Sequence, residues 1–198
     1  MPIFQLGESS EGNRLMRAGR DYVSQSGDSV LLEVLKLFIL EEKRHAQDLA
    51  RFMALENIPQ IRSHWADRAF RTSRRGLNLE LALSVLLTAE IIGLLYSRTL
   101  ELVTQSEVLQ ELARQIQHDE QHHLYFQASM LGQLRQKRSP WLLFLTHGLH
   151  RLFLWLTLRV VWIDHHCVFR AGGYTFEKFA MAAWQELEQA IVLSQTKN

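Results

Sequence analysis

A Glu-x-x-His pair occurs twice in this chain, each time in the middle of an apolar stripe with helical spacing. The pairs are Glu42 with His45, and Glu120 with His123. Each continues a run of residues at alternating steps of four and three, the spacing of one buried helical face. The runs are Leu31, Leu35, Phe38, Glu42, His45, Leu49, Phe52 and Leu109, Ala113, Ile116, Glu120, His123, Gln127, Met130. A carboxylate buried alone costs several kcal/mol, so the two insertions need a common explanation.

The two pairs belong to a longer internal repeat. Glu11 precedes Glu42 by 31 residues, and Glu90 precedes Glu120 by 30 residues. The alignment also matches Leu15 with Leu94, Phe38 with Ile116, and Glu41 with Asp119. A helix–turn–helix hairpin repeated twice predicts four helices related by a pseudo-two-fold axis. Each hairpin then supplies one Glu and one Glu-x-x-His pair.

The hydrophobic pattern predicts an all-α fold, because no alternating strand pattern is present and only three prolines interrupt the chain. We expect one domain over residues 1–198, with a four-helix core at 8–134 and additional C-terminal helices at 139–198 that pack on the core or on a partner subunit. The predicted helices span about 8–26, 29–55, 77–103, 106–134, 140–168 and 175–194, with a connection at 60–76 and a turn at 171–173.

The repeat indicates a two-metal site. In Glu-x-x-His, both side chains leave one helical face about one turn apart, so they can converge on a metal pair. Carboxylates bridge and neutralise two cations, while an imidazole binds each metal; four carboxylates and two histidines are typical of di-iron and di-manganese bundles. The candidate ligands are Glu11, Glu42, His45, Glu90, Glu120 and His123. Glu8, one turn before Glu11 on the same face, is the alternative first ligand, and a buried structural polar network is the alternative to a metal site.

Four segments resemble the ligand motifs of the ferritin-like di-iron carboxylate superfamily, the rubrerythrin- and di-iron-oxygenase-like four-helix bundles. They are Glu11-Gly12-Asn13-Arg14-Leu15, Leu40-Glu41-Glu42-Lys43-Arg44-His45-Ala46, Ala89-Glu90-Ile91-Ile92-Gly93 and His118-Asp119-Glu120-Gln121-His122-His123. The resemblance covers residues 8–134 and matches no single member closely. It implies two iron ions, with manganese or a mixed pair as the alternative, and chemistry with O₂ or peroxide.

The function expected from this resemblance is an oxidoreductase that activates O₂ or peroxide to oxidise a small substrate. No catalytic residue beyond the metal ligands is assigned. Cys167 is the only cysteine, so the chain has no rubredoxin-type iron site, and an oxygenase reaction would need an external electron donor. The alternatives are a non-catalytic protein that binds or sequesters iron, and a bundle whose metal serves stability alone.

Composition bears on the partners and the compartment. The formal net charge of +1 gives no electrostatic reason to expect nucleic acid as a partner. The first residues lack the basic and apolar regions of a signal peptide, and with one cysteine we expect a reducing cytoplasm.

Residues 141–163 are rich in Leu, Phe, Trp and Val, but Arg151 and Arg159 interrupt them. Each arginine would cost roughly 2.5–3.5 kcal/mol at the centre of a bilayer, so we expect no transmembrane span. Instead, an apolar face should pack on the four-helix core or on a second copy in a homodimer. That face comprises Trp141, Leu145, Leu149, Leu152 and Leu156. His147 and His150 are either part of this packing or supply an extra ligand.

Overall fold

The structure is a computed structural model that describes residues 1–198 except 10–11, 62, 66–77 and 196–198. The predicted all-α class is confirmed: the described residues form seven helices and no strand. The chain divides into two compact units, Met1–Ala82 and Leu83–Asn198.

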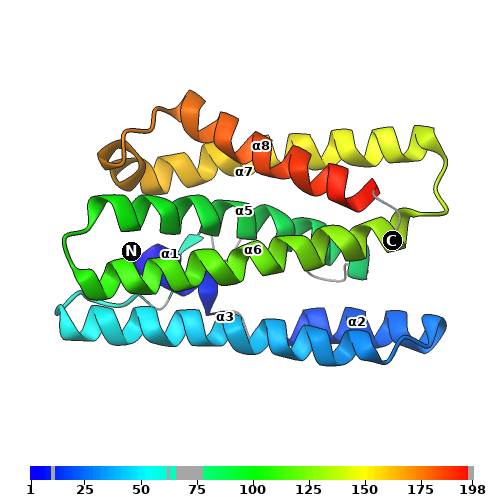
Figure 1. The fold of residues 1–198 in the computed structure, drawn as a ribbon, viewed down its shortest axis with the longest axis horizontal. Helices are drawn as coiled ribbons and strands as arrows, with labels where there is room; N and C mark the ends of the chain where they lie inside the picture. The colour runs from blue at the N-terminus through cyan, green and yellow to red at the C-terminus, as the bar shows by residue number, and fades with distance from the viewer. Residues whose placement is uncertain (10–11, 62, 66–77, 196–198) are drawn as a thin grey trace. The chain divides into compact units, whose positions relative to one another are not determined.

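The first unit is built on α3 (Val30–Leu55), against which α1 (Pro2–Glu8) and α2 (Asn13–Ser26) both pack. Figure 1 shows α2 alongside the first part of α3. Leu35, Leu49 and Met53 of α3 are fully buried. The side-chain amide of Gln5 donates a hydrogen bond to the Ala46 carbonyl oxygen at 3.2 Å, which ties α1 to the middle of α3.

The helix predicted over residues 8–26 is confirmed over 13–26, which form α2, but its start is wrong, because Glu8 belongs to a separate helix that was not predicted. The separate helix, α1, ends at Glu8, and α2 begins at Asn13. Ser9 follows α1, and its hydroxyl donates to the Leu6 carbonyl oxygen at 2.6 Å. Gly12, directly before α2, has a φ of 71°, a left-handed conformation that interrupts a right-handed helix and that glycine adopts without steric cost.

The second unit contains most of α5 (Leu79–Val103), with α6 (Glu107–Arg135), α7 (Pro140–Ala171) and α8 (Phe176–Gln195). In Figure 1, α8 runs along both α6 and α7, with which it makes close contacts. The start of α6 is capped by the Ser106 hydroxyl, which accepts a hydrogen bond from the Leu109 amide at 3.4 Å. Pro140 begins α7, a position where its missing N–H costs nothing.

Both predicted apolar stripes lie inside the protein. All seven positions of the α6 stripe are buried, Glu120 and His123 included. On α3, six of the seven are buried, and the Glu42 side chain is 14% exposed. The polar pairs are therefore held in the interior, where the apolar periodicity of the two helices placed them.

Gly132 allows α6 and α8 to approach closely. A Cβ built on Gly132 would overlap the Ser194 carbonyl oxygen, a backbone atom that cannot move without shifting the end of α8. We therefore expect Gly132→Ala to lower the free energy of unfolding by about 1–3 kcal/mol. The matched control is Gly148→Ala on α7, where a Cβ meets nothing within 4 Å. That change should raise stability by up to about 1 kcal/mol. Urea unfolding followed by circular dichroism measures both, and equal effects of the two changes would contradict the close approach.

Two described helices are long and apolar enough to cross a membrane, judged by length and composition: α5 and α7. Their surroundings differ. The most apolar stretch of α5 is 72% buried within the protein, whereas that of α7 is only 17% buried. α5 is therefore covered by protein as a core helix is, while α7 presents most of its apolar surface to the outside.

The apolar face predicted on α7 does not pack on the core of this chain. Its five predicted members, Trp141, Leu145, Leu149, Leu152 and Leu156, are each 45–67% exposed. The side of α7 that packs inside carries His147, His150, Leu154, Leu158 and Phe169 instead. Packing of this face on the core of the chain, one of the two predicted arrangements, is therefore wrong. Packing on a second copy stays a prediction.

Candidate metal centre

The first unit gathers two carboxylates and an imidazole. Glu8 is the last residue of α1, while Glu42 and His45 lie one turn apart in the middle of α3. The His45 Nδ1 atom lies 3.6 Å from Glu42 Oε1 and 3.8 Å from Glu8 Oε2. Glu8 and His45 are buried. One ligand atom from each of the three residues lies within 4.8 Å of the others, so the three could hold a metal ion together.

The second unit contains a group of the same composition. Glu90 lies in the middle of α5, and Glu120 and His123 lie one turn apart on α6. The His123 Nδ1 atom lies 3.6 Å from Glu90 Oε2 and 3.6 Å from Glu120 Oε2. All three side chains are at most 4% exposed. Their ligand atoms also lie within 4.8 Å of one another. Each unit therefore holds one Glu, Glu-x-x-His group, in which Glu8 stands three residues before Glu11, the residue that the repeat aligns with Glu90.

Gln127, one turn after His123 on α6, supports the second group. Its side-chain amide donates a hydrogen bond to Glu90 Oε1 at 3.3 Å. Burial alone would raise the pKa of Glu90, but hydrogen bonds with Glu120, His123 and Gln127 and the positive charge of His123 outweigh it. The pKa of Glu90 is therefore held below its ordinary value, and this carboxylate is kept in the form that binds cations.

The structure brings together five of the six predicted ligands within their own units: Glu42 with His45, and Glu90 with Glu120 and His123. The sixth, Glu11, lies outside the described residues. Glu8, the alternative first ligand, is the carboxylate found beside His45. Gln127 was not predicted to take part, although its place on the same stripe as His123 was the signal that could have found it.

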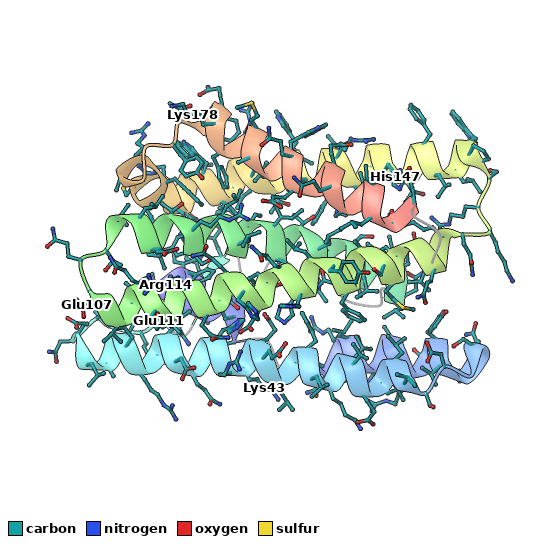
Figure 2. All side chains as sticks on the ribbon, in the orientation of Figure 1. Lys43, Glu107, Glu111, Arg114, His147 and Lys178 are labelled. Atoms are coloured by element: carbon teal, nitrogen blue, oxygen red, sulfur yellow. The ribbon has the colours of Figure 1, made fainter. Side chains whose placement is uncertain are left out.

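His147 and His150 belong to a different environment in the second unit. A ring nitrogen of His150 lies 3.1 Å from the Thr88 hydroxyl, at hydrogen-bonding distance. His147 lies in the first half of α7, near the C-terminal end of α8 (Figure 2). Among the described residues, neither histidine belongs to a group that could hold a metal ion. Packing inside the unit is therefore the role that the structure supports.

A comparison of the chain with known protein families, with curated proteins and with solved structures finds no match.

Each group has the donors that a divalent metal ion needs. Two ligands at right angles on one ion, each about 2.1 Å from it, lie about 3 Å apart. The separations of 3.6–3.8 Å are close to that value and longer than an ordinary hydrogen bond. Carboxylate oxygens with imidazole nitrogens suit iron, manganese or zinc better than ions that prefer thiolates. The buried Glu and His residues thus form a candidate metal site of unassigned metal.

Proposed function

We propose that the two groups together hold a dinuclear metal centre, with iron as the metal and manganese or a mixed pair as the alternative. The repeat supports the pairing, because both groups have the same residue types in the same order, with matching separations from the histidine Nδ1 atoms. Four carboxylates balance two divalent cations, so a filled centre would be close to neutral and tolerable in an apolar interior.

We propose further that the protein is an oxidoreductase that uses O₂ or peroxide to oxidise a small substrate. When bound in the reduced state, iron or manganese would supply the electrons for such a reaction. The chain's own contribution is a set of anionic ligands in an apolar surrounding that limits access of water. Cys167 is the only cysteine in the chain, so electrons for an oxygenase reaction would come from an external donor. The observation that carries the proposal is the duplicated, buried Glu, Glu-x-x-His group.

An anaerobic titration with ferrous ion, followed by exposure to O₂ under stopped-flow absorbance, tests this function. We expect saturation at two ferrous ions per chain and then oxidation within one rapid phase. Continued uptake of ferric iron far beyond two ions would indicate iron sequestration instead. Binding that raises thermal stability without any reaction with O₂ would indicate a metal that serves stability alone. No binding at all would make the two groups a structural polar network.

The first ligand can be assigned with two substitutions. Because Glu8 lies beside His45, we expect Glu8→Ala to weaken ferrous binding by at least about tenfold, the loss of one charged ligand. Glu11→Ala is the matched comparison, three residues further along the chain. Isothermal titration calorimetry on both variants gives the affinities. A loss with Glu11→Ala and none with Glu8→Ala would assign the ligand to Glu11, as the repeat alignment first indicated.

A further inference from the structure

The inner side of α7 combines buried apolar side chains, Leu154, Leu158 and Phe169, with polar groups. The polar groups are His147 and His150, both at most 6% exposed, and Arg151, which forms two hydrogen bonds of 2.7 and 2.8 Å with Glu188 of α8. The outer side of α7 is apolar. The outer side of a surface helix that faces water is normally polar. The outer side of α7 is thus built for contact with something other than water.

The outer side forms one continuous stripe over more than four turns. Its large apolar side chains are each 40–69% exposed, and no charged residue interrupts them on that side. The stripe comprises Trp141, Leu142, Phe144, Leu145, Leu149, Leu152, Trp155 and Leu156. Sixteen residues of helix extend about 24 Å. Eight such side chains together expose more contiguous apolar surface than the few hundred Å² that is usual for a soluble monomer.

Basic residues lie at both ends of this stripe. Lys137 and Arg138 precede it, and Arg159 follows it. The Arg159 guanidinium lies 4.3 Å from the centre of the Trp155 ring, so the cation is held directly at the border of the apolar surface. Between residues 137 and 170 the sole acidic residue is Asp164. An apolar stripe of Trp, Phe and Leu with cationic ends matches the chemistry of an anionic lipid surface.

We propose that α7 attaches this protein to an anionic membrane surface, with the helix in the plane of the bilayer and the stripe at the level of the upper acyl chains. The tryptophans Trp141 and Trp155 suit this level, because their rings are apolar with one polar N–H. Lys137, Arg138 and Arg159 would lie among the lipid headgroups. The attachment does not depend on the metal centre, since none of its residues belongs to either Glu and His group.

A second copy of the chain fits the stripe less well than lipid does. In an antiparallel two-fold pairing of α7 helices, Lys137 and Arg138 of one copy would face Arg159 of the other. In a parallel pairing, each basic end would face itself. Either arrangement sets like charges against each other at both ends of the contact. Phosphate headgroups complement these charges instead.

A spanning orientation is also less favourable than attachment in the plane. The inner side of α7 packs on α8, and the Arg151–Glu188 pair links the two helices. Carrying α7 through a bilayer would bring this pair and the buried histidines into the hydrocarbon, or would break the packing that holds them. In-plane attachment leaves that packing intact and covers the outer stripe alone.

Co-sedimentation of the purified full-length chain with vesicles tests the proposal, using phosphatidylcholine with and without phosphatidylglycerol. We expect binding to the mixed vesicles that weakens as salt is raised. The double change Leu149→Gln/Leu152→Gln should weaken it by at least about tenfold, because two exposed leucines lose their contact with acyl chains. The matched control is Leu102→Gln/Val108→Gln, two exposed apolar side chains elsewhere in the same unit, and should change binding by less than about twofold. Circular dichroism melts verify that both variants fold.

Several results would overturn the proposal. In one, the wild-type protein does not bind vesicles and sediments as a dimer, and Leu149→Gln/Leu152→Gln dissociates that dimer. The stripe would then be a subunit interface. Another is equal binding by both double variants. Recovery of the expressed protein exclusively in detergent extracts, resistant to alkaline carbonate, would mean that the helix spans the bilayer. The substitution Arg159→Gln gives an independent readout, because it should reduce the preference for phosphatidylglycerol without changing metal binding.

Discussion

The substitution Glu120→Ala should abolish tight metal binding. The Glu120 side chain is 1% exposed, and its Oε2 atom lies 3.6 Å from His123 Nδ1. In the proposed centre it is one of four carboxylates that neutralise two cations, and its removal leaves a net positive charge in a buried site. We expect the affinity for ferrous ion to fall by about 100-fold or more, because the loss of a partner that only supports a ligand already costs about 10–100-fold.

Thermal unfolding gives a second measure of the same loss. At a free metal concentration of 100 times the dissociation constant, metal binding to the folded state stabilises the wild type by about 2.7 kcal/mol. Glu120→Ala should lack this gain. The control is Glu111→Ala. Glu111 lies near Arg114 in the first turns of α6, in a 2.8 Å ion pair at the surface (Figure 2). Glu111→Ala should keep both the wild-type affinity for ferrous ion and the metal-dependent gain in stability. Full metal binding by Glu120→Ala would remove Glu120 from the centre and refute the dinuclear arrangement.

A second large effect is expected in acid, from the buried imidazole of His150. Burial is the main cause that lowers the pKa of His150 to about 4, and the charges of Arg135, His147 and Arg151 act in the same direction. The unfolded chain has a His pKa of about 6.5. As the pH falls from about 6.5 to about 4, the unfolded state takes up a proton at this position and the folded state does not. The free energy of unfolding therefore falls through this window, by about 3 kcal/mol in total, whereas His150 contributes nothing at neutral pH.

Comparison with His150→Gln isolates this contribution, because glutamine retains a polar group for Thr88 and cannot take up the proton. Between neutral pH and about pH 4.5, the free energy of unfolding should fall in both proteins. We expect the fall to be about 2–3 kcal/mol smaller in the variant than in the wild type. Urea unfolding of the metal-free protein at the two pH values measures it. The control is His166→Gln, at a histidine toward the surface of the same helix that bonds the Ile163 carbonyl oxygen. Identical pH dependence in wild type and His150→Gln would contradict the burial of a neutral imidazole.

The sequence predicted the site well where periodicity was the deciding signal. The stripes through Glu42 and Glu120 place a polar pair on an apolar helical face, and burial of that face decides where the pair points. The bounds of α3 and α6 also agree with the predicted helices within one residue, because long, strongly periodic segments have few alternative structures. The class of fold and the histidine-containing half of each group therefore follow from the local pattern.

The N-terminal ligand could not be settled in the same way. The prediction placed Glu8 and Glu11 one turn apart in a single helix, whereas α1 ends at Glu8 and the left-handed Gly12 directly precedes α2. A glycine in a sequence is compatible with both a helix and a break, so periodicity does not reveal which occurs.

The outer face of α7 is a similar case. Hydrophobicity shows that a face must be covered, but not whether protein or lipid covers it.

The two Glu and His groups match in their ligands but differ in what supports them, and Gln127 marks the difference. Its amide steadies Glu90, whereas the corresponding place in the first half of the repeat is occupied by Leu49, which offers no donor. Glu90 also lies in mid-helix on α5, while Glu8 ends a helix of seven residues. Local opening of so short a helix costs less free energy than opening of a long core helix, and each opening would remove Glu8 from its ion. The two ions of the proposed centre would therefore be kinetically distinct, one exchanging readily with solution and one retained.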